Sequence, residues 1–312
     1  MIRVDRVGRT TVQDEGRRGY AHLGVPRSGA ADLGSYRLAN RLAGNDSRAA
    51  VLETSGGLVA TALRDVTIVL TGADCEATVD ARPLSRCWAT TMRAGESLRV
   101  ERIRGGTRAY VSVAGGIVGI EGPTGDHRLL GSLSHDTLSG FTPVSLHDGV
   151  VLRLSAPLKQ PSSLDLAIDH DRSRPLAMSE GPHQEMFTVE FIRWVVSTTW
   201  SVSATSNRVG IRLVAVRATN GAATTYSSNL ASSSGAVRGE LESIPLVRGA
   251  VQVTPSNELV VMLADHPTTG GYPVIGVVAA RDVDRLSQLG QSSIVTFRKE
   301  VAPWFKSGNR AV

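Results

Sequence analysis

The sequence predicts a mainly β protein made of two β-rich halves. Short apolar runs rich in Val, Ile and Thr recur along the chain, and glycine stands at the end of several of them. Only a few short stretches show the helical spacing of apolar residues. Short strands at regular spacing with glycine at the corners are typical of a sandwich or a barrel. We therefore expect barrel-like or sandwich-like subdomains with a few short helices.

The composition supports a sizeable aliphatic core. The chain has 312 residues, of which 41% are hydrophobic and only 4% aromatic, and its net charge is +5. This length suits one large domain or two of ordinary size. Nearly all the positive charge is arginine, scattered along the chain and not interleaved with aromatic residues. We therefore expect no nucleic-acid binding.

The two cysteines, Cys75 and Cys87, form no zinc-like cluster, so no metal site is expected. Their small number fits a reducing compartment. The first residues carry charges where a signal peptide needs an apolar segment. No apolar run approaches the roughly 20 residues of a membrane span. We expect a cytoplasmic protein that does not contact a membrane.

The first half begins with a polar region that is predicted to contain a helix. Asp32 is expected to cap its N-terminus, Leu33, Tyr36 and Leu42 form its apolar face, and Gly44 stands where the chain leaves it. Strands are expected at Val66–Thr71, Leu98–Val100, Ala109–Ala114 and Val150–Leu154. Glycine is expected to stop two of these strands, at Gly72 and at Gly115-Gly116.

Residues 157–180 show no periodicity and contain three prolines, which predicts a linker. The expected domains are residues 1–156, an N-terminal β-rich subdomain, and residues 181–301, a C-terminal β-barrel subdomain. Residues 302–312 are expected to form a mobile tail.

The second half shows the same β character with two short helices. Pro182 is expected to open a helix in which Phe187, Phe191 and Trp194 form a core stripe. Asp282 is expected to cap a second helix. Strands are expected at Val195–Val202, Ser206–Leu213, Gly249–Val253, Leu259–Ala264, Val274–Ala280 and Ile294–Phe297.

The turn Asp265–Pro273 joins two strands that are expected to be buried, and it contains an unusual number of polar and ionisable side chains. It holds an acid, an imidazole, two hydroxyls, a pair of glycines and a phenol. Glycines let backbone N–H groups approach a ligand closely. The alternative is a hairpin in which Asp265 and Thr268 cap the turn and His266 lies in solvent. The spacing favours neither interpretation.

Four sequence blocks carry a family resemblance: Thr10–Arg17 with Gly24–Asp32, Ala114–Ile117 with Leu130–Ser132, Ser206–Leu213, and Asp265–Pro273. Together they resemble the allophanate hydrolase subunit 2 family, also called the KipA family or the family of the 5-oxoprolinase C-subunit. The likeness runs from about residue 3 to residue 298. The chain departs from the family at Ser134-His135-Asp136, where Ser-Thr-Asp is commoner.

The resemblance implies two cyclophilin-like β-barrel subdomains and a heteromer with a subunit 1 or KipI-like partner. It implies an amide-processing enzyme that is inactive without this partner. The first interpretation is a 5-oxoprolinase C-subunit, for hydrolysis of the 5-oxoproline lactam with ATP. The second is an allophanate hydrolase subunit 2 or carboxyltransferase subunit, for biotin-dependent transfer of a carboxyl group from carboxybiotin to urea or a related amide. The third is a KipA-type regulatory protein that sequesters an inhibitor of a sensor kinase.

No cofactor is expected to be bound covalently. Biotin carriers attach biotin to a lysine that follows methionine, whereas the lysines here follow Leu158, Arg298 and Phe305. Carboxybiotin would therefore arrive on a separate carrier. The chain has no Gly-x-x-x-x-Gly-Lys-Ser/Thr loop, so a site for ATP would be of another kind or shared with the partner.

An amide-directed site needs donors for a developing oxyanion and groups that move a proton. The expected catalytic residues are Asp14, Asp265 and His266 for proton transfer and Arg208 as a donor. The expected substrate-binding residues are Gln13, Ser28, Asn207, Thr269, Gly270, Gly271 and Tyr272. The alternatives are a structural ion pair for Arg208 and a turn cap for Asp14. Asn40 and Glu53 are expected to hold the N-terminal loop to the barrel.

Overall fold

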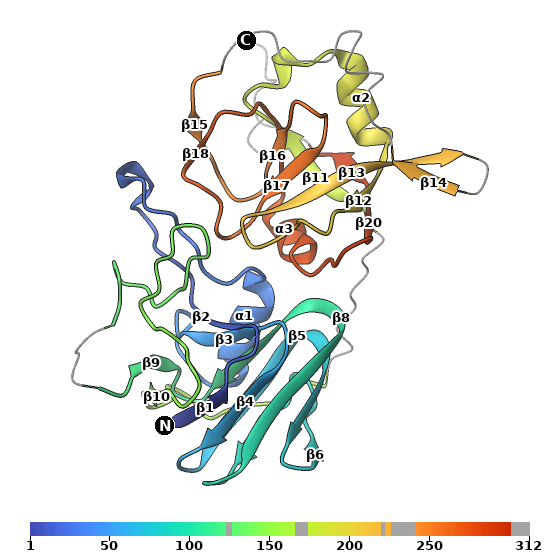
Figure 1. Ribbon diagram of the computed structural model, residues 1–312. Coiled ribbons are helices and arrows are strands. Elements are labelled where there is room, and N and C mark those ends of the chain that lie inside the picture. Colours follow the sequence, from blue (N-terminus) through green and yellow to red (C-terminus); the bar gives the residue numbers. More distant parts are fainter. Residues whose placement is uncertain (123–126, 166–173, 220–221, 226–240, 301–312) are drawn as a thin grey trace, which may run out of the picture. The chain divides into compact units, whose positions relative to one another are not determined.

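A computed structural model describes residues 1–122, 127–165, 174–219, 222–225 and 241–300 (Figure 1). The chain divides into two compact units, Met1–Asp169 and His170–Val312. Strands account for 39% of the chain and helices for 12%, which confirms the mainly β class. The tail at residues 302–312 lies outside the described residues.

The described part of unit 1 folds as a ten-stranded antiparallel sheet that forms a half-barrel. Its main path runs β2-β3-β8-β4-β1-β10-β9, and β5 pairs with β6, β7 and β8. The strands are β1 (Ile2–Arg6), β2 (Thr10–Gln13), β3 (Val51–Thr54), β4 (Leu58–Ala62), β5 (Val66–Val79), β6 (Arg82–Pro83), β7 (Thr90–Met92), β8 (Ser97–Val113), β9 (Ile117–Ile120) and β10 (Val151–Leu154).

Two strands of unit 1 are longer than the sequence predicts. β5 continues through Gly72, and β8 is one strand where two were expected (Figure 1). Their pairing shifts register at three places between Gly72 and Ala77. Such β-bulges absorb residues that do not fit the ladder without ending it. The prediction that Gly72 stops a strand is therefore wrong.

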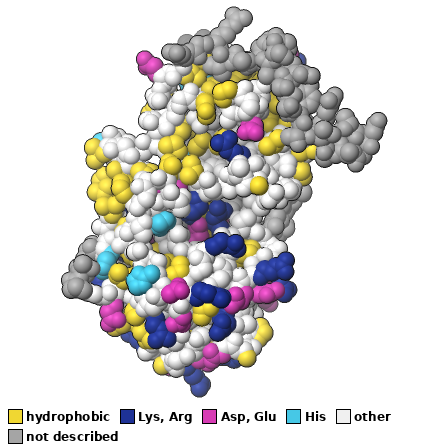
Figure 2. All heavy atoms as spheres, in the orientation of Figure 1, with side chains coloured by type: hydrophobic (Ala, Val, Ile, Leu, Met, Phe, Trp, Pro, Cys, Tyr) yellow, Lys and Arg dark blue, Asp and Glu magenta, His cyan; other side chains and the backbone are white. Residues whose placement is uncertain are grey.

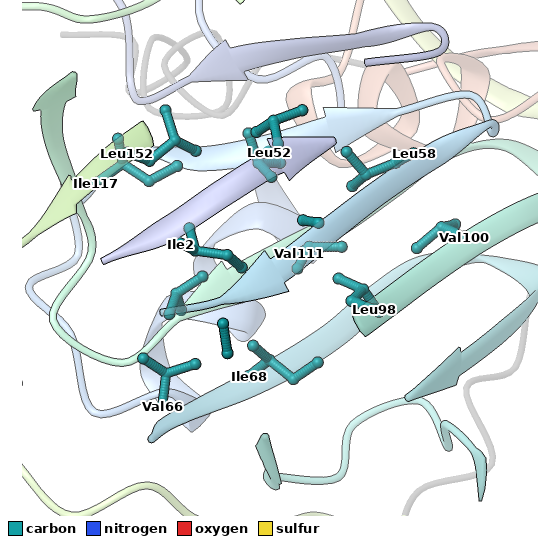
Figure 3. Packing of buried hydrophobic residues seen from close by; sticks show 14 of the residues in the cluster. Ile2, Leu52, Leu58, Val66, Ile68, Leu98, Val100, Val111, Ile117 and Leu152 are labelled. Carbon is teal, nitrogen blue, oxygen red and sulfur yellow. The ribbon is translucent and has the colours of Figure 1, made fainter. Parts of the chain in front are cut away.

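The core of unit 1 is aliphatic, as expected from the composition. Ile2, Leu52, Leu98 and Val111 are fully buried, and they come from β1, β3 and the two ends of β8 (Figure 3). Burial of a side chain of this size contributes about 1.5–3 kcal/mol of hydrophobic free energy. The half-barrel is therefore stabilised mainly by packing between its strands.

The helix α1 (Leu33–Leu42) confirms the first predicted helix, and a single 3₁₀ turn, η1 (Ala21–Leu23), precedes it. The Asp32 side chain accepts a hydrogen bond of 2.9 Å from the N–H of Ser35, as an N-cap should. Gly44 follows with φ 70°, and a Cβ there would overlap the carbonyl oxygen of Lys159. Glycine is thus required at this exit.

The described part of unit 2 holds a nine-stranded sheet in the order β20-β12-β13-β17-β16-β19-β11-β21, with β14 paired to β13. β20 and β21 lie at opposite ends of this order, yet only Thr296 separates them in the chain. The sheet therefore nearly closes into a barrel, and β15 and β18 form a separate pair.

The strands of unit 2 are β11 (Leu176–Glu180), β12 (Thr199–Val202), β13 (Gly210–Thr219), β14 (Ala222–Thr225), β15 (Ile244–Pro245), β16 (Ala250–Val253), β17 (Leu259–Met262), β18 (Thr269–Gly270), β19 (Val274–Val278), β20 (Ile294–Val295) and β21 (Phe297–Lys299). The helices are η2 (Gln184–Met186), α2 (Val189–Ser197) and α3 (Ala280–Leu286).

The predicted helix at Pro182 begins later than expected. A 3₁₀ turn comes first, and α2 starts after Thr188, whose hydroxyl accepts a hydrogen bond from the N–H of Phe191. Val195 belongs to this helix, so the strand expected from there is wrong and begins at Thr199. Phe191 and Trp194 lie 5.3 Å apart between ring centroids, which confirms the core stripe.

Asp282 is not the cap of the last helix. α3 begins with Ala280, so the acid lies within the first turn, and it is 1% exposed. Its carboxylate accepts a hydrogen bond of 2.8 Å from the N–H of Ala177 in β11. The buried acid therefore joins the helix to the sheet.

The segment 157–180, expected to be a linker, is partly built into both units. The N–H groups of Leu158 and Lys159 donate to the carbonyl of Gly44, and the N–H of Leu164 donates to the carbonyl of Cys87. At the other end, β11 is a strand of the second sheet. Backbone pairing, which leaves no periodic side-chain pattern in so short a segment, explains why the sequence indicated a linker.

No helix within the described ranges is long and apolar enough to cross a membrane. On the face shown in Figure 2, arginine and lysine side chains are interspersed with acidic ones. That face carries no continuous basic stripe.

Candidate active site

Asp14 lies just after β2 in unit 1 and is 3% exposed. Its Oδ1 accepts hydrogen bonds from the hydroxyls of Ser132 (2.7 Å) and Ser134 (2.5 Å). Oδ1 also accepts from the N–H of Gly16 (2.8 Å), and Oδ2 accepts from the N–H of Leu133 (2.7 Å). This carboxylate joins two distant loops, which favours the structural interpretation. A role for Asp14 in proton transfer stays a prediction.

Gln13 and Ser28 meet at one carbonyl group. The Gln13 side-chain amide and the Ser28 hydroxyl each donate a hydrogen bond of 2.9 Å to the carbonyl of His135. The Gln13 amide also donates to the Thr11 hydroxyl. Its Oε1 is buried without a hydrogen bond from any residue that the structure describes. The Gln13 side chain is fully buried, and its substrate-binding role stays a prediction.

Two further residues of this cluster were not predicted. Arg17 is 1% exposed, donates to the Ser134 carbonyl and lies with its guanidinium carbon 5.7 Å from the centre of the Phe141 ring. Asp136 is fully buried, and its Oδ1 accepts hydrogen bonds from two backbone N–H groups. The Gly16-Arg17 and Ser134-His135-Asp136 motifs were the available signals, but residue type alone did not show that these charges are buried.

A buried network holds the Ser28 loop against the sheet. The Tyr110 hydroxyl donates to Glu53 Oε2 (2.9 Å) and accepts from the N–H of Asp32 (2.8 Å). The same Glu53 oxygen accepts from the N–H of Ala31 (2.9 Å). Burial, and next the charge of Glu53, raise the pKa of Tyr110 well above its usual value. Glu53 thus holds the N-terminal loop, as the sequence predicted.

The variant Tyr110→Phe should destabilise unit 1. Removing the hydroxyl leaves the Asp32 N–H without its acceptor and removes one of the donors to Glu53. A buried group left unsatisfied costs about 1–3 kcal/mol. Chemical denaturation measures this loss. Tyr272→Phe is the matched control, because Tyr272 is 47% exposed, and the stability of this variant should be unchanged. Equal stability of the two variants would contradict the network.

Arg208 and Asp265 form a buried ion pair in unit 2. The guanidinium Nε donates to Asp265 Oδ2 at 2.8 Å, and Nη2 donates to Oδ1 at 3.0 Å. The side chains are 10% and 0% exposed. The Asp265 N–H also donates to the Arg208 carbonyl. A bidentate pair fixes the plane of the guanidinium, and this is the ion-pair geometry that the sequence left as an alternative for Arg208.

His266 is 8% exposed, so it does not lie in solvent as the hairpin interpretation required. Its Nδ1 lies 2.7 Å from the carbonyl oxygen of Pro267. A carbonyl oxygen only accepts, so Nδ1 must carry the proton. The neutral ring then has Nε2 as its basic nitrogen, which is the arrangement that a general base needs.

The remaining predicted residues of unit 2 are mostly exposed. Asn207 is exposed and its Oδ1 accepts from the N–H of Val209 at 2.8 Å, as a turn residue does. Gly270 pairs with Ile244 in the small β15–β18 sheet. Thr269, Gly271 and Tyr272 are exposed on the same loop. Their substrate-binding roles stay predictions.

The cysteines are poor nucleophiles. Burial, and next the neighbouring charge of Asp74, raise the pKa of Cys75 to about 11. Burial also raises the pKa of Cys87. Both thiols therefore stay protonated near neutral pH, and a thiolate mechanism is disfavoured. The described residues hold no group of three or more His, Cys, Asp or Glu side chains that could bind a metal ion.

The predicted site residues fall into two groups, one in each unit. Gln13, Asp14 and Ser28 are brought together in unit 1, and Arg208, Asp265 and His266 in unit 2. The catalytic and substrate-binding roles of both groups stay predictions.

Comparison with known proteins identifies the family to which this chain belongs. The family model described as carboxyltransferase domain, subdomain A and B, matches residues 23–299. The C-subunit of 5-oxoprolinase from Escherichia coli (strain K12) is 32% identical over 300 residues, which cover 93% of this chain and 88% of that protein. The urea amidolyase of Saccharomyces cerevisiae is 29% identical and is covered over 16% of its length.

Solved structures support the same family. The crystal structure of TTHA0988 superposes with a TM-score of 0.78 at 31% identity, over 95% of this chain. The present chain spans 55% of that protein, which therefore carries a further region. The urea amidolyase of K. lactis also gives a TM-score of 0.78, at 27% identity, with 18% of its chain covered. The present chain belongs to the carboxyltransferase-domain family, subdomains A and B.

Proposed function

We propose that this chain is the C-subunit of a two-component 5-oxoprolinase, which hydrolyses the lactam of 5-oxoproline to glutamate with ATP. The observation that carries this proposal is the match to the 5-oxoprolinase C-subunit over 93% of this chain and 88% of the relative. The urea amidolyase relative is covered over only 16% of its length, so most of that protein has no counterpart here. A cytoplasmic location fits this role.

The reaction adds the oxygen of water to the lactam carbonyl carbon and breaks the C–N bond. The ring nitrogen takes up a proton and leaves as the amine of glutamate, and ATP is hydrolysed to ADP and phosphate in the same turnover. A negative charge develops on the carbonyl oxygen. We assign the Arg208 guanidinium, oriented by Asp265, to stabilise this charge. His266 Nε2 takes the proton of the attacking water, because Nδ1 is held by the Pro267 carbonyl.

The chain contributes only half of the proposed enzyme. No phosphate loop is present in the sequence, so the ATP site is assigned to the complex with a subunit 1 or KipI-like partner. The further region of TTHA0988, beyond the 55% that this chain spans, supports the existence of such a second module.

The decisive test is turnover of 5-oxoproline with ATP. We expect no activity from the isolated chain and full activity from the co-purified pair. An isolated chain as active as the pair would contradict the obligate-subunit proposal. A pair that binds but turns over neither 5-oxoproline nor any other lactam would contradict the proposed function.

The second candidate is a carboxyltransferase subunit that moves a carboxyl group from carboxybiotin to urea or a related amide. The family model and the urea amidolyase relatives favour it. The same purified pair, assayed with carboxybiotin and urea, distinguishes the two functions. Carboxylation of urea without 5-oxoproline hydrolysis would establish this alternative.

A further inference from the structure

A cavity in unit 1 lies apart from every residue assigned to the candidate active site. Its volume is about 550 Å³, within the range of small-molecule sites. One wall is the start of β5 with Thr91 of β7, and the other is the chain that leaves β10, from Leu154 to Pro161. We propose that this cavity binds a small carboxylic acid that also carries an N–H donor, such as an α-amino acid or a lactam acid.

The positive charge in the cavity is Arg64. This exposed side chain makes no hydrogen bond or ion pair with any residue in the described ranges. A guanidinium in this state presents its paired N–H donors to a ligand, and a carboxylate is the group that matches them bidentately. Arg64 is the only cationic side chain of the described lining.

The adjacent Asp65 supplies the second part of the recognition. Its Oδ1 accepts a hydrogen bond of 2.8 Å from the N–H of Ala94, which fixes the carboxylate at the cavity. Its Oδ2 accepts no hydrogen bond from a described residue. This oxygen can accept an N–H from the ligand and repels a second carboxylate. Arg64 and Asp65 therefore select a ligand with one acid and one donor.

The rest of the lining fits a small and partly apolar body. Val66, Leu154 and Pro157 supply apolar surface. The hydroxyl of Thr91 and the amide of Gln160 belong to the same lining and make no hydrogen bond within the described residues. These groups can satisfy a carbonyl oxygen of the ligand. None of the lining residues belongs to the groups around Asp14 or Arg208, so the proposal does not depend on the proposed function.

The test is a titration of the full chain carrying ¹³C-labelled Val and Leu methyl groups, followed by NMR. We expect 5-oxoproline and glutamate, at millimolar concentration, to shift the methyl signals of Val66 and Leu154. The probe 2-pyrrolidinone has the lactam but no carboxylate, and succinate has carboxylates but no N–H. Both probes should bind at least about tenfold more weakly than 5-oxoproline and glutamate. 2-Pyrrolidinone lacks the carboxylate that binds Arg64, and the second carboxylate of succinate is repelled by Asp65.

Two variants connect the shifts to the cavity. Arg64→Gln should weaken binding of both acids by about tenfold or more, and its lack of described partners means that the fold should be unaffected. Arg102→Gln is the control, because this exposed arginine of β8 is not in the lining. Unshifted Val66 and Leu154 methyls, equal binding of 2-pyrrolidinone, or unchanged binding by the Arg64 variant would each overturn the proposal.

Discussion

Replacing Asp265 by Asn should destabilise unit 2 by about 3–5 kcal/mol, which is the usual cost of removing one partner of a buried ion pair. Asp265 is fully buried, and the Arg208 side chain that it binds is only 10% exposed. The variant leaves the guanidinium without its counter-charge. Chemical denaturation of the isolated chain measures the loss. Glu258→Gln, at the exposed pair with Arg212, is the control and should cost at most about 1 kcal/mol.

A double variant separates structure from catalysis at this pair. Arg208→Met with Asp265→Leu replaces both charges by apolar groups and should recover most of the lost stability. If Arg208 stabilises the oxyanion, the complex containing this variant should still lose roughly 10²-fold or more in kcat. A double variant with both normal stability and normal turnover would show that the pair is only structural.

Asp14→Ala should be the second large effect, with a loss of about 4 kcal/mol or more in unit 1. Four donors lose their acceptor, and each buried donor left unsatisfied costs about 1–3 kcal/mol. They come from Gly16, Ser132, Leu133 and Ser134. Thermal and chemical unfolding of the isolated chain measure this loss.

The control for Asp14 is Asp46→Ala. Asp46 is exposed, and its carboxylate accepts a hydrogen bond within its own turn, from the N–H of Arg48. We expect a loss of at most about 1 kcal/mol. A loss of stability for Asp14→Ala no larger than that for Asp46→Ala would contradict the structural interpretation. If the complex containing the Asp14 variant were also inactive, the result would favour proton transfer by Asp14.

Local features of the fold could be read from the sequence. The helix capped by Asp32 and the buried strands on either side of the Asp265 turn were predicted correctly, because caps and apolar periodicity act within a few residues. The class of fold followed from the same signals. The lengths of β5 and β8 could not be predicted in this way, because each strand is extended by pairing with the backbone of the other. The β-bulges between them leave no signal in the amino-acid composition.

Long-range partners explain the remaining differences. Asp282 looked like a helix cap, but its acceptor oxygen is used by Ala177, 105 residues away in sequence. Asp14 is bound by donors 118 to 120 residues away, and Arg208 and Asp265 are 57 residues apart. Residue type identified Asp14, Arg208 and Asp265 as candidate functional residues. Only the fold shows that both carboxylate oxygens of Asp14 accept hydrogen bonds. It also shows that Gln13 Oε1 accepts none from a described residue.

The order in which the sheets are assembled affects how the chain can fold during synthesis. In unit 1, β1 lies between β4 and β10, and Ile2 pairs with Leu152. In unit 2, β11 pairs with β19 and, in parallel, with β21, where Leu176 meets Phe297. Each sheet is thus completed by the last of the described strands of its unit to leave the ribosome. Such non-local pairing slows folding, and until it forms, β1 and β11 expose an unpaired edge on which nascent chains can aggregate.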